Sequence, residues 1–246
     1  MKVMSIAGID PSGGAGLLAD IKTFQNIGVF GTGIPTALTC QNPYEMISTK
    51  GIEVEYIEEE IDSVLTCYND IKYIKTGMLY STEIIKLISH KIKEYNLKAI
   101  VDPVMVSTAG GNLAKEDLNN AMIKYLLPES ILTTPNISEA SELSGVEVNN
   151  KEDAINAAIE LGKICDVIIT GGHLDGINTL SLNGKISNIE EELIDTDNLH
   201  GTGCVFSAAI VSYLALGDTL EIAIKKSLDY VHSGVLNGNY GTLIHK

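Results

Sequence analysis

Short apolar runs alternate along most of the chain with stretches whose apolar residues recur at helical spacing. Runs typical of strands cover residues 2–9, 34–40, 73–77, 99–101, 131–133 and 167–170. Helical spacing covers residues 15–27, 57–68, 81–95, 115–126, 138–143, 151–163, 202–216 and 219–236. Strands separated by helices of this length form crossover units, so the pattern predicts an α/β protein with a mostly parallel sheet and helices on both faces.

One further pair of strand-like runs has no helix between its members. Residues 178–182 and 185–189 flank Asn183–Gly184, a dipeptide that strongly favours a two-residue hairpin turn. We expect this hairpin at the edge of the sheet.

The residues that follow the predicted strands are the candidates for function, because ligands of open α/β sheets bind beyond the carboxyl ends of the strands. Those positions hold Asp10 to Gly14, Gln41–Asn42, Gly77–Met78, Asp102–Pro103, Pro135–Asn136 with Glu139, Gly171 to His173, and the run up to Cys204.

Composition fits one domain over residues 1–246 and limits the partners. A net charge of −15 disfavours nucleic acids and anionic membranes, which bind basic surfaces. The longest nearly apolar run, 204–216, is shorter than the roughly 18 residues of a membrane span. No secretory signal opens the chain, so we expect a cytoplasmic protein. All basic residues are lysines, so bound phosphate would need backbone amides, lysines or a metal ion.

The sequence HGTGC at residues 200–204 precedes a long apolar helix. Gly201 and Gly203 allow close backbone approach, Thr202 can cap the helix, and the first helical amides attract an anion. Cys204 lies in this first turn, where the helix dipole is expected to lower the pKa of the thiol, and a thiolate could accept a proton from a hydroxyl group. The alternatives are a glycine-rich turn that only starts a helix and a small packed cysteine.

Two carboxylates, Asp102 and Glu139, follow neighbouring strands and should face one crevice. They suit a hydrated magnesium ion that carries nucleotide phosphates, although each alone could be a helix cap or a solvated charge. Asp10 could cap the first helix or shape a pocket, and His173 and His200 are interpreted as packing or hydrogen-bonding residues. The four cysteines show no zinc spacing, and the sequence contains neither a Walker phosphate loop nor a GxSxG elbow.

Seven motifs together carry a resemblance. The run AGIDPSGGAGLLADIKTF, the pair Gln41–Asn42, and the motifs KTGML, VDPVM, TPNISEA, TGGHL and HGTGC stand in the order found in one family. The chain resembles the hydroxymethylpyrimidine and phosphomethylpyrimidine kinases of thiamine biosynthesis, within the ribokinase-like superfamily. The resemblance implies a three-layer ribokinase-like sandwich with a mostly parallel central sheet, helices on both faces and an edge hairpin.

The resemblance also implies an activity and roles for residues. The activity is transfer of the ATP γ-phosphoryl group to 4-amino-5-hydroxymethyl-2-methylpyrimidine and then to its monophosphate, with Mg²⁺. Residues Gly201, Thr202 and Gly203 would stabilise the phosphoryl group and Cys204 would be the base. Gln41 would hold the pyrimidine, because an amide offers a donor and an acceptor to an aminopyrimidine. The other implied roles are pyrimidine contacts by Gly8, Asp20 and Met78, metal and phosphate contacts by Asp102 and Glu139, and nucleotide contacts by Asn136, Thr170 and Gly172.

Three departures from the family pattern keep other functions open. Thr170 and Asp197 stand where the family usually has lysines, and residues 107–111 differ from its usual AKSGD. Lys75 is a candidate to compensate for the lost charge. The alternatives are a pyridoxine or pyridoxal kinase and a pyrimidine-binding sensor with impaired catalysis. Relatives of this family are often dimers, so we expect a homodimer.

Overall fold

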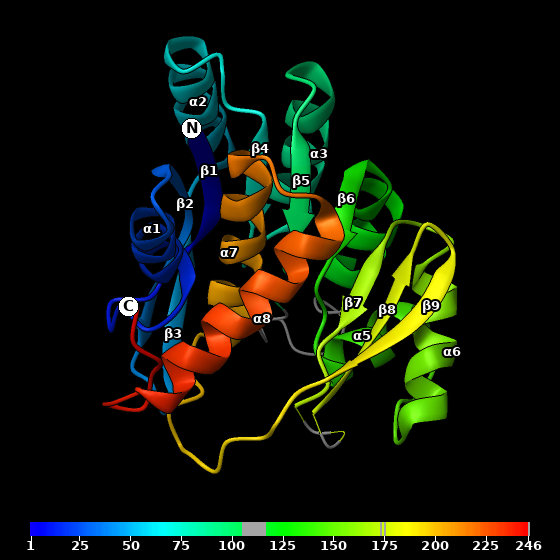
Figure 1. Cartoon of the computed structure of the whole chain (residues 1–246). Coiled ribbons are helices and arrows are strands. Elements are labelled where there is room, and N and C mark those ends of the chain that lie inside the picture. The colour runs from blue at the N-terminus through cyan, green and yellow to red at the C-terminus, as the bar shows by residue number, and fades with distance from the viewer. Residues whose placement is uncertain (105–116, 173, 175, 246) are drawn as a thin grey trace.

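A single nine-stranded sheet runs through the described part of the chain, in the order β3-β2-β1-β4-β5-β6-β7-β8-β9 (Figure 1). The computed structural model describes residues 1–104, 117–172, 174 and 176–245. The strands are β1 Lys2–Ile9, β2 Phe30–Gln41, β3 Met46–Gly51, β4 Tyr73–Thr76, β5 Lys98–Val101, β6 Ser130–Thr133, β7 Val167–Ile169, β8 Ile177–Leu182 and β9 Lys185–Glu190.

The sheet is parallel in its centre and antiparallel at both edges. Strands β2, β1, β4, β5, β6 and β7 pair in parallel. The edge strand β3 pairs antiparallel with β2, and β8 and β9 form an antiparallel hairpin beside β7. The predicted edge hairpin is confirmed. The carboxyl ends of all six parallel strands therefore lie at the same end of the sheet.

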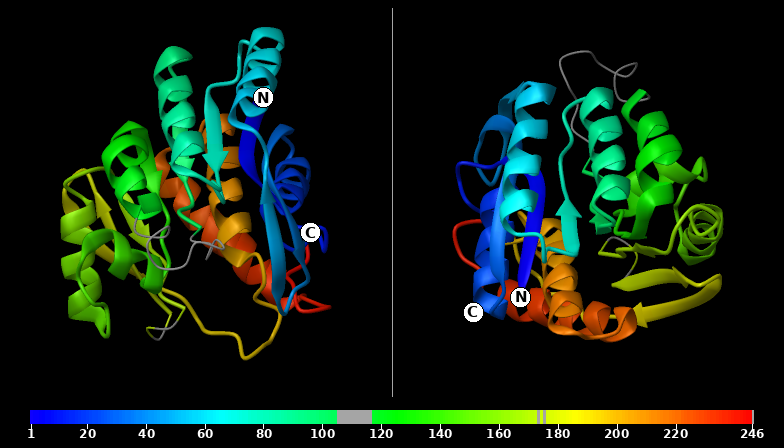
Figure 2. Two further views of the ribbon diagram at one scale, coloured as in Figure 1. Left: turned by 180° about the vertical axis from the view of Figure 1, so that it is seen from behind. Right: turned by 90° about the horizontal axis from the view of Figure 1, so that it is seen from above.

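Helices cover both faces of this sheet, which gives the three layers that the sequence predicts (Figure 2). One face packs against α1 Gly16–Ile27, α7 Thr202–Leu216 and α8 Leu220–Leu236. The other face packs against α2 Val54–Cys67, α3 Thr82–Glu94, α5 Ile137–Ser144 and α6 Lys151–Leu161. Within the described ranges, no helix combines the length and the apolar character needed to cross a membrane.

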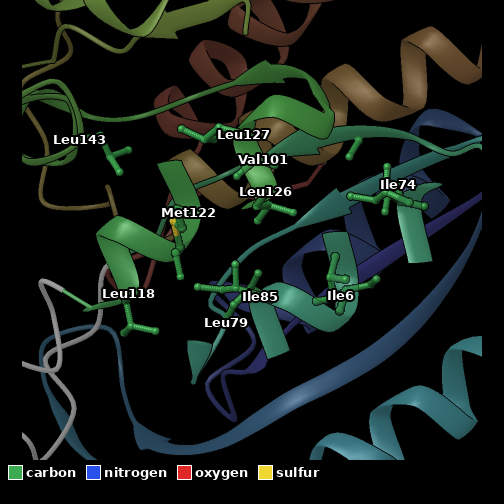
Figure 3. Packing of buried hydrophobic residues seen from close by; sticks show 14 of the residues in the cluster. Ile6, Ile74, Leu79, Ile85, Val101, Leu118, Met122, Leu126, Leu127 and Leu143 are labelled. Carbon is green, nitrogen blue, oxygen red and sulfur yellow. The ribbon is translucent and has the colours of Figure 1, made fainter. Parts of the chain in front are cut away.

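Side chains that alternate along the central strands supply the two cores. Met4, Ile6 and Ile74 join the cluster under α2 and α3, part of which Figure 3 shows, while Val3 and Ile100 join the cluster under α7 and α8. Successive residues of a strand point to opposite faces of the sheet, so neighbouring residues of one strand, such as Val3 and Met4, belong to different clusters. Helix α7 is buried almost all round, because it packs between the sheet and α8.

The structure differs from the sequence-based expectation in three places. Strand β2 begins four residues before the predicted 34–40 run. Strand β3 was not expected, because its residues are mostly exposed and show no apolar alternation. Of the predicted helix 115–126, the described part ends in the π-helical turn η1 Met122–Leu126, followed by the 3₁₀ turn η2 Leu127–Glu129.

Candidate active site

The carboxyl ends of the parallel strands and the start of α7 surround a cavity of about 320 Å³, which we call the strand-end cavity. Residues from both halves of the chain form its walls. Of the residues predicted from the sequence, it brings together Gly8, Gln41, Met78, Asp102, Asn136, Glu139, Thr170, Gly201, Thr202, Gly203 and Cys204.

A second cavity of about 520 Å³ adjoins the first, between α7, α8 and residues 191–195, and we call it the helix-side cavity. Thr170, Thr202 and Gly203 line both cavities, so the two meet at these residues. Gly172 lines the helix-side cavity alone. The predicted site is thus divided into two compartments that meet at these three residues.

Helix α7 begins at this junction with a left-handed backbone conformation that strongly favours glycine. Gly201 is the N-cap with φ 87°, and a Cβ on it would lie 1.8 Å from the Gly14 carbonyl oxygen. The Gly201 carbonyl accepts from the Val205 amide at 2.9 Å, which leaves the Gly203 and Cys204 amides without an intrahelical acceptor. The predicted side-chain cap by Thr202 is wrong, because no side chain caps this helix. Amides and dipole together create positive potential at the cavity wall.

The Cys204 thiol does not have the lowered pKa that the helix dipole predicts. Cys204 is half-buried on the wall, where burial, with Asp102 and Asp20, raises the pKa of the thiol to about 12. Lys75 and a hydrogen bond from the Gly16 amide act in the opposite direction without overcoming burial. In this structure the thiol therefore keeps its proton at neutral pH.

Asp20 lies behind the cavity and not on its wall, so the structure does not support the predicted pyrimidine contact. Its carboxylate is fully buried, and each carboxylate oxygen accepts a hydrogen bond from Lys75 Nζ at 2.9 Å, while Oδ2 also accepts one from Ser5 Oγ. Burial by itself lowers the pKa of Lys75, but Asp20, Cys204 and Asp102 together raise it above its ordinary value. Lys75 is equally buried, so it does not replace a phosphate-binding lysine at the cavity surface.

Asp10 and His200 join the two glycine-rich loops of the site. Asp10 accepts from the Ser12 amide and hydroxyl at 2.8 Å and from the Ala15 amide at 2.9 Å, and His200 Nε2 lies 2.8 Å from Asp10 Oδ2. Burial by itself raises the pKa of Asp10, but these hydrogen bonds hold it below its ordinary value. Asp10 therefore stabilises the turn before α1 and anchors His200, which lines the strand-end cavity.

The two predicted metal ligands face the same cavity and fit a magnesium ion. Burial raises the pKa of Asp102, whose Oδ2 lies 3.6 Å from Lys75 Nζ and 3.4 Å from Ser207 Oγ, so a cation would stabilise its charge. Glu139 forms a capping box with Asn136 at the start of α5. The described residues contain no group of three or more potential metal ligands. Two carboxylates are enough for Mg²⁺, because it keeps most of its waters.

Several residues of the strand-end cavity were not singled out from the sequence. Thr39 precedes Gln41 by two residues on β2 and so shares its face, a signal that the sequence contains. Met46 belongs to the unexpected strand β3, and Thr134 follows β6. The remaining unexpected wall residues are Ala15, Gly16 and Val104. His200, interpreted from the sequence as a packing or hydrogen-bonding residue, also lines the wall and lies within hydrogen-bond distance of Asp10.

The departures from the family pattern fall in different places. Thr170 lies at the junction of the cavities, whereas exposed Asp197 lines neither of them. Residues 107–111 and His173 lie outside the described residues. Among the described positions, only Thr170 therefore lacks the family's lysine on the wall of the strand-end or helix-side cavity.

A model of the phosphomethylpyrimidine kinase family matches residues 10–242 of the chain. A hydroxymethylpyrimidine/phosphomethylpyrimidine kinase of Bacillus subtilis (strain 168) is 37% identical over 245 residues, covering 96% of this chain and 89% of the relative.

Solved structures show the same fold. The ADP complex of a Bacillus subtilis pyridoxal kinase superposes with a TM-score of 0.91 at 33% identity, covering 99% of this chain and 97% of the other. A phosphomethylpyrimidine kinase from Clostridium difficile 630 superposes with a TM-score of 0.80 at 32% identity, covering 94% and 99%.

Proposed function

The chain belongs to the phosphomethylpyrimidine kinase family, and from this premise we propose that it transfers the γ-phosphoryl group of ATP to 4-amino-5-hydroxymethyl-2-methylpyrimidine and then to its monophosphate. The observation that carries the proposal is the meeting of two cavities at the start of α7, with Gln41 and Cys204 on the wall of the smaller one. The arrangement offers one compartment to each substrate and one point for transfer between them.

The strand-end cavity fits a flat heterocycle. Gln41 ends β2 on the wall and can both donate to and accept from an aminopyrimidine edge. Gly8 leaves room for Met78, since a Cβ on Gly8 would lie 2.3 Å from Met78 Cε. Met46 adds a second polarizable side chain to the wall. Recognition thus combines one amide with apolar contacts around the ring.

The helix-side cavity suits the base and sugar of the nucleotide. Its walls include Phe206 and Leu228 but also Glu191, Glu192 and Asp195, which would repel phosphate. The phosphate chain should therefore extend toward the junction at Thr170, Thr202 and Gly203. The ADP complex of the related pyridoxal kinase supports an adenine nucleotide as the donor.

Transfer itself needs positioning and electrostatic stabilisation. The Gly203 and Cys204 amides would bind the oxygens of the moving phosphoryl group, a role worth several kcal/mol when such donors are preorganised. Cys204 Sγ can accept a proton only as a thiolate, so the thiol must first release its own proton to solvent. As the hydroxymethyl oxygen bonds to phosphorus and the bond to ADP breaks, the proton of the alcohol then passes to the Cys204 thiolate. Magnesium, held by Asp102 and Glu139, would neutralise phosphate charge and also the Asp102 carboxylate that opposes ionisation of Cys204.

A second candidate activity is phosphorylation of pyridoxal. The observation that favours it is the TM-score of 0.91 with a pyridoxal kinase, above the 0.80 found with a phosphomethylpyrimidine kinase. Both substrates are flat heterocycles that carry a hydroxymethyl group, so Gln41 and Cys204 could serve either.

A coupled assay of ADP release tests the proposal against this second candidate. The purified protein is given ATP with the pyrimidine, its monophosphate or pyridoxal, each with and without magnesium. We expect turnover of both pyrimidines, dependent on magnesium and faster than turnover of pyridoxal. Faster turnover of pyridoxal would favour the second candidate, and tight pyrimidine binding without any product would identify a sensor.

Three finer statements complete the proposal. The whole chain, residues 1–246, acts as one kinase domain in the cytoplasm, and two copies associate. The exposed apolar residues beside edge strand β3 support association, because an uncovered strand edge readily pairs with another chain.

A further inference from the structure

Residues 239–245, which we call the C-terminal segment, lie against the loop that leads into α7. Thr242 forms a parallel β-bridge with His200. Leu243 is buried in a small cluster with residues of α1, α7 and α8, which fixes the segment to the helices around the site. The proposed function gives this segment no role.

His200, the residue before the N-cap of α7, is held at three of its atoms. Its amide donates to the Gly241 carbonyl at 3.3 Å, and its carbonyl accepts from the Thr242 hydroxyl at 3.0 Å. Its Nε2 lies 2.8 Å from Asp10 Oδ2. Two of these contacts come from the C-terminal segment, so the backbone just before Gly201 is fixed by residues far from it in sequence.

The Thr242 side chain also lies against the turn that precedes α1. Its hydroxyl is 3.5 Å from the Gly14 carbonyl oxygen, a second and longer contact than the one with His200. A Cβ on Gly14 would lie 2.9 Å from Thr242 Oγ1 and 2.7 Å from His200 Cδ2, so these residues pack closely. One hydroxyl group therefore bridges the two glycine-rich loops.

Both loops carry groups of the candidate site. The loop before α7 continues into Gly203 and Cys204, whose amides have no intrahelical acceptor. The loop before α1 continues into Gly16, whose amide donates a hydrogen bond to Cys204. A shift of one loop against the other would therefore move both the amides and the thiol relative to a bound substrate.

We infer that Thr242 is a positioning residue, whose hydroxyl holds the two loops together so that the Gly203 and Cys204 amides meet the migrating phosphoryl group. The inference rests on the proposed function for the reaction. Thr242 acts through His200 and Gly14, since it lines neither cavity. A hydrogen bond outside the cavities can matter in this way, because a misplacement of about 1 Å can lower a rate about 100-fold.

The test compares two threonines that each donate to a backbone carbonyl distant in sequence. Thr242→Val keeps the shape of the side chain and removes the hydroxyl, and Thr242→Ser restores the hydroxyl. Thr32→Val is the matched control, because Thr32 is half-buried like Thr242, donates to the Val3 carbonyl at 3.1 Å and lines neither cavity.

Two measurements are made on each variant. Steady-state kinetics with ATP, magnesium and the pyrimidine give kcat and KM. Amide hydrogen exchange in residues 13–16 and 200–204 reports on the two loops without any substrate, so it does not depend on the identity of the reaction.

We expect Thr242→Val to lower kcat at least about tenfold while KM for the pyrimidine changes less than about twofold, because Gln41 and Met78 stay in place. Exchange in both loops should become about tenfold faster, the effect of losing one hydrogen bond. Thr242→Ser should restore both values, and Thr32→Val should change neither.

Three results would overturn the inference. The first is a kcat of Thr242→Val within about twofold of the Thr32→Val control. The second is a fall in kcat that Thr242→Ser does not restore, which would assign the effect to the shape of the side chain. The third is unchanged exchange in both loops.

Failure of the proposed function is distinguishable from failure of this inference. If the wild type phosphorylates pyridoxal and neither pyrimidine, the same kinetic comparison is made with pyridoxal. If it phosphorylates none of them, the proposed function fails and the exchange data decide. Faster exchange in both loops of Thr242→Val would then support the bridge, and unchanged exchange would overturn it.

Discussion

Cys204 is the residue on which the proposed proton transfer depends. Its thiol lines the strand-end cavity beside Asp102, and Lys75 lies behind both in the core. Burial disfavours the thiolate, so the Cys204 thiol stays protonated until positive charge binds in the cavity. A thiol held in this state fits a base that works only when both substrates are bound.

Replacing Cys204 by alanine removes the proton acceptor and little else from the wall. We expect kcat to fall at least about 100-fold, the lower range for general-base catalysis. The dissociation constant for the pyrimidine should change less than about twofold, because Gln41 and Met78 remain in place. Steady-state kinetics and calorimetry measure the two effects.

Cys165→Ala is the matched control for this prediction. Cys165 is also half-buried, and burial raises the pKa of its thiol to about 11, but it lines neither cavity. It should keep wild-type kcat. A Cys204→Ala variant with the same kcat as the control would assign the proton to another group.

Site residues could be predicted from the sequence where they follow a recognisable strand or belong to a motif. Gln41 and Cys204 are of this kind, and both line the cavity. Asp20 is in a motif too, but its position on α1 points it at Lys75 on β4, 55 residues away in sequence. The pKa of Cys204 and the contacts of Thr242 depend on everything packed around them, which no local pattern contains.

At the scale of elements, helix α7 has a glycine at each end with a left-handed backbone. Gly201 at the N-cap has φ 87° and Gly217 at the C-cap has φ 103°. Their surroundings differ. A Cβ on Gly201 would meet the Gly14 carbonyl oxygen at 1.8 Å, whereas nothing lies within 4 Å of a Cβ on Gly217.

Alanine at these two positions separates backbone strain from damage to the site. Gly217→Ala should cost about 1 kcal/mol of unfolding free energy, from the left-handed conformation alone, and should keep full activity. Gly201→Ala must in addition push apart the two loops of the site, so kcat/KM should fall at least about 100-fold. Denaturant unfolding and kinetics measure both. Equal activity in the two variants would mean that the loops need not touch for transfer.

Most elements follow from their own sequence, and the exceptions have physical reasons. Helices α3, α6 and α8 begin at residues whose side chains cap them, Ser81, Asn150 and Thr219, which are signals that the sequence displays. Strand β3 has no buried face to impose alternation, since it lies at the sheet edge with most side chains exposed. The π-helical turn at Met122–Leu126 buries Met122 and Leu126 in the core and has no local signature in the sequence.

At the scale of the whole molecule, the uncovered edge at β3 leads to a prediction about association. Leu38 and Ile47 at this edge are 51% and 71% exposed. We expect a dimer in light scattering that Ile47→Lys converts to a monomer. Ile159→Lys on α6, which changes an isoleucine 43% exposed at a distance from this edge, should leave the dimer intact.

The ionic-strength dependence of the monomer–dimer equilibrium provides a second test of the expected association. Each copy carries a net charge of −15, so the copies repel one another at low salt. Added salt screens this repulsion and should strengthen the dimer. A wild-type protein that stays monomeric at every salt concentration would contradict the expected homodimer.

The burial of Lys75 in the core has a consequence for phosphate binding in the cavities. This ammonium group is held by Asp20 and Asp102, and no lysine lines either cavity within the described ranges. Under the proposed function, the negative charge of the phosphoryl donor ATP must then be balanced by a cation that binds together with it. Two ligands that bind in this way raise each other's affinity by the same factor. The supply of free divalent cation would therefore set the rate even where the nucleotide is abundant.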